Sequence, residues 1–396
     1  MPEHTRSLAL LAASTLATAL LVLFVEPTGA ADAVGESLDL ESIALHSEDG
    51  SLRVEPVVLV QPMFLLHVDA SGAPETEGSG FALRRAEAGL KGHVGGATYL
   101  KLVGALEHGE AVVVDAYVHI DPLDGSLTLR TGFFKPPYCR QFLVTDAKRQ
   151  LADEAVALGI MAPHEQLGVQ LGGALFDVVD YRVGVWVAAD AAFAGATGAA
   201  LDPLVGGSFV VHPLGPVGAD EEPDLVRTAS PKFSIGGSLL YDRRGDRVVP
   251  LAGIGDVGYS DNRLRIGGEL AGKWRGASLA SEVFLSRVWV AEDTPLEVAD
   301  RLPPVRGFGG YLQAGYFAVA ELLEVALRFD FVDRDLEVAG WDIHPAAGVQ
   351  LYPAGHLFKM MIMYRLNFPI DDPYPVASSY HTPTTHDAFL VLQGAF

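Results

Sequence analysis

The chain has 396 residues, with 50 acidic and 28 basic side chains and a net charge of −22. This acidic balance argues against nucleic acid as a partner, because nucleic-acid-binding proteins need basic surfaces to contact phosphates. Cys139 is the single cysteine, so no internal disulfide framework exists. The mean hydropathy is +0.25, which is unusual for a soluble protein and is explained by apolar residues spread over alternate positions.

The N-terminus has the features of a secretory signal peptide. Arg6 precedes an apolar stretch over residues 8–25, and small residues at Thr28 and Ala30 suit cleavage after Ala30. The apolar stretch is also long enough to cross a membrane as a helix, so an uncleaved anchor is the alternative. We predict a signal peptide, and its removal would leave a net charge of −21.

The predicted organisation is a signal peptide over residues 1–30, a short flexible segment over 31–53 and one barrel domain over 54–396. Residues 31–53 are rich in Ser, Glu and Asp and show no alternation, which favours a flexible segment. Length alone would allow more than one domain, but no Pro/Gly/Ser linker divides the remaining chain into two cores.

Apolar and polar residues alternate from residue 54 to the end of the chain, which is the pattern of β-strands. The clearest apolar face is formed by Phe358, Met360, Ile362, Tyr364, Leu366 and Phe368. The runs are about ten residues long, as a tilted strand needs to cross hydrocarbon, whereas strands of soluble sandwiches have about five or six. The predicted fold class is therefore all-β, a transmembrane antiparallel β-barrel.

About sixteen strands are predicted, an even number that puts both chain ends on the periplasmic side. They cover residues 54–68, 80–94, 97–106, 111–120, 127–134, 166–175, 180–190, 232–242, 247–257, 262–274, 276–290, 307–317, 323–333, 343–352, 356–368 and 387–396. Short turns are expected on the periplasmic side and long loops outside, which is typical of bacterial barrels. The short turns are 95–96, 121–126, 275 and 353–355, and the long loops are 135–165, 191–231, 291–306 and 369–386.

The final run, residues 387–396, ends in the aromatic Phe396. A short last strand closed by an aromatic residue, in a chain with a secretory signal, is typical of the closing seam of a bacterial outer-membrane barrel. We therefore predict that the protein is located in the outer membrane, with outer-membrane lipid as its surroundings.

Three segments resemble the phosphate-selective porins O and P. Residues 80–92 resemble that family's second strand, and residues 127–138, which include a Lys-Pro-Pro corner, resemble its strand before the third loop. The pairing of residues 348–352 with 356–359 is similar to its penultimate hairpin. The resemblance covers most of residues 50–396. It implies a homotrimeric porin of sixteen strands, whose third loop folds into the pore and whose lumen carries anion-binding basic residues.

The third loop departs from that family at two places. Residues 151–155 read Leu-Ala-Asp-Glu-Ala where the family tends to have Glu-Arg-Ser. His164 and Glu165 stand before residues 168–172, where the family favours an arginine. We therefore predict a water-filled channel for passive diffusion of small hydrophilic solutes, with a mild preference for anions and phosphate as a candidate among them.

The charges divide unevenly between the two faces of the strands. With the apolar face towards lipid, eleven bases face the lumen: Arg85, Lys91, Lys101, Arg130, Arg182, Lys232, Arg265, Lys273, Arg328, Lys359 and Arg365. Seven acids share that face: Glu55, Glu87, Asp115, Glu269, Glu282, Glu324 and Asp330. The lumen wall is thus net positive in an acidic chain, and charges at the narrow part of a pore set its selectivity.

The predicted pore-lining, anion-binding residues are Arg85, Arg130, Lys135, Arg140, Lys148, Arg149, Arg328, Lys359 and Arg365. Four of them lie in the third loop together with Asp146, Asp153 and Glu154, and opposed bases and acids would create a transverse field there. The twelve histidines show no ligand spacing, so neither a metal nor a cofactor is predicted.

Three alternatives remain for the function. Acidic loops such as residues 220–222 could make the pore general or cation-preferring. An outer-membrane barrel enzyme would need a catalytic set near the rim, for which Ser378, Ser379, His381, His386 and Asp387 are the available residues. Their spacing does not require catalysis, so we predict no enzymatic activity and no catalytic residues. A structural barrel with a sealed lumen is the third alternative.

Overall fold

The computed structural model describes residues 44–69, 78–107, 110–187, 203–218, 220–251, 255–292, 294, 296–338, 340–370 and 384–396. The predicted signal peptide, residues 1–30, lies outside these residues. Within the described part of the chain, no helix is long and apolar enough to cross a membrane.

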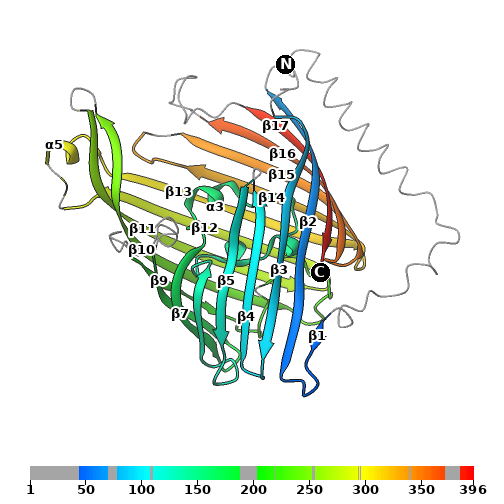
Figure 1. Cartoon of the computed structure of the whole chain (residues 1–396). Coiled ribbons are helices and arrows are strands. Elements are labelled where there is room, and N and C mark those ends of the chain that lie inside the picture. The colour runs from blue at the N-terminus through cyan, green and yellow to red at the C-terminus, as the bar shows by residue number, and fades with distance from the viewer. Residues whose placement is uncertain are drawn as a thin grey trace, which may run out of the picture.

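Sixteen antiparallel strands, β2–β17, form a closed barrel (Figure 1). Each strand pairs with its neighbours in the chain, and β17 pairs with β2 to close the ring. The strands are β2 (Leu52–Asp69), β3 (Gly80–Val94), β4 (Thr98–Glu107), β5 (Glu110–Ile120), β6 (Thr128–Phe134), β7 (Gln166–Leu175), β8 (Val179–Val187), β9 (Pro203–Val211), β10 (Lys232–Leu251), β11 (Gly255–Trp274), β12 (Ala277–Val290), β13 (Val305–Val319), β14 (Leu323–Asp333), β15 (Trp341–Ala354), β16 (Phe358–Ile370) and β17 (Thr385–Ala395). The predicted fold class is confirmed.

The outer surface of the barrel is apolar and the inner surface is polar. On β14, Leu327 and Phe329 are exposed, whereas Glu324, Arg328 and Asp330 between them are buried. A soluble protein would place these two sets the other way round. Because a closed barrel leaves no unpaired strand edge and presents an apolar belt to lipid, the chain is an outer-membrane barrel protein.

The strand prediction contains two errors, one strand too many and one strand missed, so the predicted total of sixteen still agrees with the structure. Residues 247–257 are not a separate strand, because β10 continues to Leu251 and β11 begins at Gly255. The charged run 242–247 suggested a turn, but it contains only a β-bulge between Arg244 and Arg247. Strand β9 was missed, because the glycine pair at 206–207 interrupts its apolar pattern.

The missed strand changes which side of the membrane residues 212–231 face. The predicted long loop 191–231 is two connections, one before β9 and one after it, on opposite ends of the barrel. Residues 212–231 therefore leave from the same end as the short turns at 95–97 and 275–276. By the asymmetry of bacterial barrels this is the periplasmic end. We call residues 212–231 the insert.

The described part of the predicted flexible segment forms a small hairpin. Strand β1 (Leu45–His46) pairs with Val54 and Arg53, and β2 begins at Leu52, two residues before its predicted start. Ser47 and Ser51 both donate hydrogen bonds to the carboxylate of Asp49 in the intervening turn. The turn is therefore closed by local side-chain hydrogen bonds.

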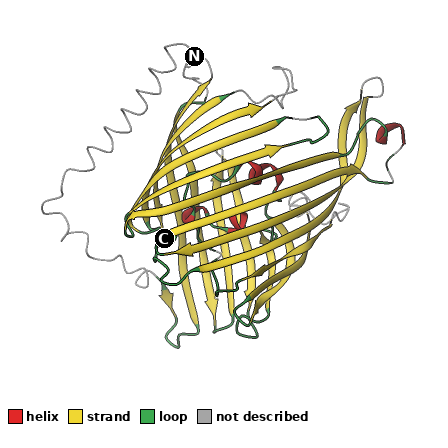
Figure 2. Cartoon of the chain, turned by 180° about the vertical axis from the view of Figure 1, so that it is seen from behind, coloured by secondary structure: helices red, strands yellow, loops and turns green. Residues whose placement is uncertain are grey.

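Loop 3, residues 135–165, folds into the barrel as predicted. Its helices α2 (Arg140–Leu143), η2 (Asp146–Lys148) and α3 (Val156–Met161) lie inside the ring of strands, whereas α5 (Leu296–Ala299) lies outside it (Figure 2). Helix α3 contacts β12, β13 and β14. Loop 3 is held by a buried apolar cluster that includes Phe134, Tyr138, Leu158, Trp186 and Phe284.

The closing seam includes the last residue of the chain. The backbone N–H of Phe396 donates to the Val58 carbonyl at 2.9 Å, and the N–H of Val58 donates to the Phe396 carbonyl at 2.6 Å. The ring of Phe396 is exposed on the outer surface. Phe396 thus adds one more residue pair to the seam between β17 and β2.

We predict that deleting Phe396 impairs assembly rather than conduction. The deletion removes two backbone hydrogen bonds, worth about 1 kcal/mol each, from the seam where the barrel must close. The folded, heat-modifiable form in the outer membrane should decrease on gels of unheated and heated samples. Phe396→Tyr, which keeps an aromatic ring and both hydrogen bonds, should assemble normally. Normal assembly of the deletion variant would contradict the prediction.

Candidate functional site: the narrowed lumen

Bases of the barrel wall hold the acidic side chains of loop 3. Asp146 forms ion pairs with Arg85 of β3 at 3.0 Å and with Arg149 of the loop itself at 2.9 Å. Arg149 also pairs with Glu154 at 3.0 Å. Burial by itself would raise the pKa of the Asp146 carboxyl, but Arg149 and Arg85 outweigh it and hold the pKa well below its ordinary value. Asp146 is therefore ionised and anchors the loop to β3.

Asp153 makes a second anchor on the wall. It lies 3.1 Å from Arg84 of β3 and 3.0 Å from Arg365 of β16, so it bridges two strands on either side of β17 and β2. Burial would raise the pKa of this carboxyl, but Arg84 and Arg365 outweigh it and lower the pKa to about 2. Arg365 also binds Asp387 of β17 at 2.9 Å.

Two further wall bases donate to carbonyls of loop 3. The Arg328 guanidinium donates to the carbonyls of Asp153 at 2.7 Å and Glu154 at 2.9 Å, and it pairs with Asp330 at 2.9 Å. The Lys359 ammonium donates to the Arg149 carbonyl at 2.6 Å. Arg328 and Lys359 are both almost fully buried. Arg328 and Lys359 thus hold the backbone of loop 3 against the barrel wall.

Arg84 is an anchor that the alternation pattern missed. Strict alternation places it on the lipid side, since Arg85 next to it faces the lumen. The register of β2 and β3 shifts between Gln61 and Pro62, so Arg84 is an extra residue in a β-bulge and also points inward. Pro62 has no N–H for the sheet, and prolines in sheets are confined to such irregular positions.

The insert enters the lumen from the periplasmic end and binds loop 3 through Glu222. The buried Glu222 carboxylate accepts hydrogen bonds from Gln141 Nε2 at 2.6 Å, from the Gln150 N–H at 2.7 Å and from Gln313 Nε2 of β13 at 3.0 Å. The Glu222 N–H donates in turn to the Lys148 carbonyl at 3.1 Å. One carboxylate thus joins the insert, loop 3 and the wall.

Two predicted anion-binding residues of loop 3 are engaged by the insert. The buried Arg140 guanidinium donates to the carbonyls of Gly218 at 2.5 Å and Glu221 at 2.7 Å. Lys148 pairs with Asp220 at 2.6 Å, and both side chains are exposed to water. The Glu221 carboxylate itself lies 3.2 Å from Lys273 of β11.

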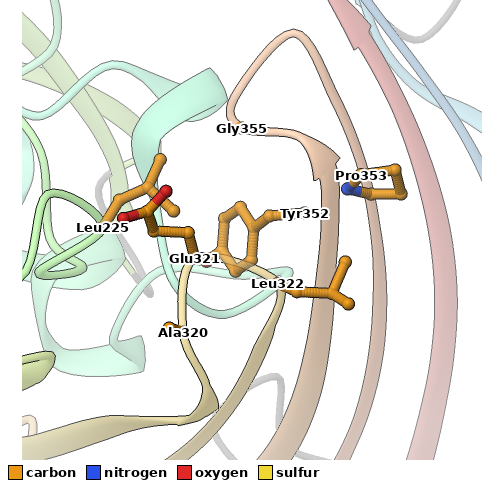
Figure 3. Close-up of a pocket in the computed structure, with 7 residues that line it drawn as sticks. All are labelled: Leu225, Ala320, Glu321, Leu322, Tyr352, Pro353 and Gly355. Carbon is orange, nitrogen blue, oxygen red and sulfur yellow. The ribbon is translucent and has the colours of Figure 1, made fainter. Parts of the chain in front are cut away.

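The insert is also seated against the turns at the periplasmic rim. Leu225 lies beside Tyr352 in a pocket of about 350 Å³, lined as well by Glu321 and Leu322 of the β13–β14 turn (Figure 3). Asp224 is fully buried and accepts from the N–H of Gly276 at 2.6 Å, in the turn between β11 and β12. The insert is therefore fixed at both its inner and its outer end.

Loop 3 and the insert cover one half of the lumen wall and leave the other open. The lumen-facing polar residues of the covered half are buried: Gln61, Glu282, Gln313, Glu324, Arg328, Asp330, Gln350, Lys359 and Gln393. Those of β3–β6 are partly exposed: Lys91, Tyr99, Lys101, Tyr117, His119 and Arg130. We call the lumen face of β3–β6 the open wall. It is the part of the described lumen wall that loop 3 and the insert leave partly exposed.

Cations without a carboxylate partner lie on this side of the lumen. Lys91 and Arg130 of the open wall, and Arg182 on β8, have no carboxylate oxygen within 4.0 Å among the described residues. Lys101, by contrast, pairs with Asp115 at 2.7 Å. Glu87, an acid of the open wall, forms none of the ion pairs found among the described residues. It is close enough to loop 3 to feel the charge of Asp146.

The nine predicted site residues therefore fall into two groups. Arg140, Arg149, Arg328, Lys359 and Arg365 hold loop 3 or the insert. Arg85, Arg130, Lys135 and Lys148 keep contact with water, although Arg85 also holds Asp146 of loop 3 and Lys148 also pairs with Asp220 of the insert. Lys135 lies 3.0 Å from the Phe142 carbonyl and 3.9 Å from Glu165. The alternation pattern also placed Lys91 and Arg182 on the lumen face, but the nine predicted site residues did not include them.

The residues considered for catalysis are not brought together where the structure describes them. His386 accepts from or donates to the Tyr364 hydroxyl at 2.6 Å, whereas its neighbour Asp387 faces the lumen and contacts His67 at 2.5 Å. The two side chains thus point to opposite faces of β17. Ser378, Ser379 and His381 lie outside the described residues.

No family model and no curated protein matches the chain. Solved structures do match. An anion-selective porin from Comamonas acidovorans has a TM-score of 0.56 at 12% identity, over 87% of this chain and 100% of that one. The trimer form of OmpT from Vibrio cholerae has 0.56 at 11%, over 87% and 99%. The outer-membrane channel DcaP of Acinetobacter baumannii has 0.52 at 9%, over 89% and 99%. At such identities the likeness shows a shared fold.

We predict that loop 3 stays anchored down to about pH 4 and loosens between about pH 4 and 2. The pKa of Asp153 is lowered to about 2 in the folded state, so its contribution is complete above its ordinary pKa and is lost as the pH falls through the lowered value. Single-channel current should be steady at pH 7 and 4 and should flicker at pH 3 to 2. Asp153→Asn should flicker at pH 7. Flicker of the natural channel that begins near pH 6 would contradict this.

We predict that Glu222→Ala releases the insert and raises conductance. The change leaves Gln141 Nε2 and the Gln150 N–H without an acceptor, at a cost of about 1–3 kcal/mol each, whereas Gln313 Nε2 keeps Gln150 Oε1 as an acceptor. Single-channel conductance in planar bilayers should increase, and the thermal stability of the barrel should fall. Asp220→Ala is the matched control, since its exposed pair with Lys148 contributes little. Equal conductance of Glu222→Ala and the natural protein would show that the insert does not narrow the path.

Proposed function

We propose that the protein is an outer-membrane porin, a water-filled channel through which small hydrophilic solutes diffuse passively with a mild preference for anions. The observation that carries the anion preference is that Lys91, Arg130 and Arg182, beside the open lumen, have no carboxylate partner among the described residues. Charges that line a narrow, low-dielectric passage determine which ions enter it.

The buried acids of loop 3 and the insert do not oppose this preference. Asp146 and Asp153 of loop 3 are bound to arginines, and Glu222 of the insert is buried among amide donors. Their charges are largely compensated, whereas Arg130 is covered by the rings of Tyr117 and Phe134, which do not neutralise it. This distribution supports an anion-preferring lumen in a chain of strongly negative net charge.

Inorganic phosphate is proposed as one of the permeating anions, on the resemblance of residues 80–92 and 127–138 to phosphate-selective porins. A homotrimer is proposed as the assembly, supported by the same resemblance and by the trimer form described for one similar barrel. A passive channel needs no catalytic residues, which agrees with the separation of His386 and Asp387.

We predict that Arg130→Glu shifts the reversal potential in a KCl gradient towards cation preference. The substitution changes the charge of the open wall by two units where no carboxylate already compensates it. Planar-bilayer recordings should show the shift at about 0.1 M salt and a smaller one at about 1 M, as the Debye length falls from about 10 Å to 3 Å. Arg306→Gln, in an exposed ion pair with Glu337, is the matched control and should leave the potential unchanged.

A general or cation-preferring pore controlled by acidic loops is the competing function. It is favoured by the net charge and by exposed acids such as Asp220. The sign of the reversal potential of the natural channel decides between the two, and a strong cation preference would refute the proposal made here.

A further inference from the structure

An aromatic strip crosses the open wall. It consists of His93, Tyr99, His119, Tyr117 and Phe134, which come from β3, β4, β5 and β6. His119 stacks on Tyr99 with ring centres 4.6 Å apart, and Tyr117 meets Tyr99 edge-on at 6.0 Å and Phe134 at 5.9 Å. His93 lies 5.7 Å from Tyr99. The rings therefore form one continuous row around part of the lumen.

The two open-wall cations without carboxylate partners lie on this strip. The Lys91 ammonium is 4.8 Å from the centre of the Tyr99 ring, and the Arg130 guanidinium is 4.7 Å from that of Tyr117 and 5.5 Å from that of Phe134. Ring faces attract cations without removing their charge. Both cations thus stay able to attract an anion, and the neighbouring rings hold them in place.

The strip is more than the edge of the apolar core. Phe134 at its far end is buried in the cluster beneath loop 3, but His93, Tyr99, Tyr117 and His119 are partly exposed to the lumen. Helix α3 of loop 3 packs against β12–β14 and the insert binds β13, and although Arg84 and Arg85 of β3 also hold loop 3, these rings keep their partial exposure. Accessible aromatic rings beside unpaired cations are what a solute with both a ring and a negative charge would contact.

We propose that the open wall binds anions that carry a flat ring, with aromatic carboxylates as the preferred class. The carboxylate would be attracted by Arg130 and Lys91, and the ring would pack edge-to-face against the exposed parts of Tyr99 and Tyr117, because His119, Lys91 and Arg130 lie over the faces of these two rings. A small inorganic anion gains only the charge attraction, because it has no ring to pack against an aromatic side chain. This inference rests on the proposed channel function and adds a binding site to it.

The first experiment compares three carboxylates on the natural channel. Benzoate, cyclohexanecarboxylate and acetate carry the same charge, and the first two have similar size but only benzoate is flat. Each is titrated into KCl on the periplasmic side of a planar bilayer, and the concentration that half-blocks the chloride current is measured. We expect benzoate to block at the lowest concentration and acetate at the highest. Equal block by benzoate and cyclohexanecarboxylate would overturn the role of the rings.

The second experiment separates the ring from the charge. Tyr99→Leu should weaken block by benzoate by about two- to tenfold, as expected for the loss of one aromatic contact, and change block by acetate little. Arg182→Gln is the matched control, because it removes a lumen cation of β8, a strand that neither belongs to the strip nor pairs with β3–β6. It should lower anion preference and leave the ratio of benzoate to cyclohexanecarboxylate block unchanged.

The outcomes of these experiments also distinguish the two proposals. Anion preference without discrimination between the two ring acids overturns the aromatic site and leaves the porin function. Benzoate-specific block in a cation-preferring pore contradicts the anion preference and supports the aromatic site. Heat-modifiable migration checks that Tyr99→Leu is folded, and Tyr117→Leu replaces it if it is not. If a folded Tyr99→Leu channel discriminated between benzoate and cyclohexanecarboxylate as well as the natural channel does, Tyr99 would not be part of the site.

Discussion

The attraction between the acids of loop 3 and the bases of the barrel wall determines the shape of the lumen. Asp146 and Asp153 reach Arg85, Arg84 and Arg365, which belong to β3 and β16. A charge buried in a low-dielectric interior is costly unless it is paired, so these residues can be satisfied only with the loop in its inward position. The barrel by itself would be wide, and the ion pairs narrow it by fixing one segment against one side.

The insert enters from the periplasmic end of the barrel and covers the same side of the lumen as loop 3. Glu222 binds loop 3 and the wall together, and Asp224 and Leu225 seat the insert at the periplasmic rim. As a result the covered half of the lumen is packed like a protein core, with lysine and arginine buried in it. The polar residues of the open half stay partly exposed.

This division explains how an acidic chain can present a basic lumen. Counting every inward charge treats Lys359 like Arg130, although Lys359 is sealed beneath the loop and Arg130 faces water. The wall bases that hold loop 3 form ion pairs with its acids or donate hydrogen bonds to its carbonyls. The cations left on the open wall are fewer, and they lie on aromatic rings. In the proposed channel, selectivity would then depend on a small set of side chains near β3–β8, while most of the net charge of −22 lies on other residues.

The sequence by itself determined the barrel class and the lipid-facing side chains of the predicted strands, because alternation with period two is a local property of each strand. The total of sixteen strands was reached through two errors that cancel, and the inward third loop was expected from the resemblance to porins. The sequence did not determine which inward residues are covered by loop 3 and the insert and which stay exposed in the lumen. Arg84 faces inward only because Pro62 forces a bulge in the neighbouring strand. The glycine pair in β9 hid a strand and thereby the side from which the insert enters. Which bases are covered and which are open depends on contacts such as Lys359 with Arg149, 210 residues apart in the chain, and only the closed tertiary structure creates them.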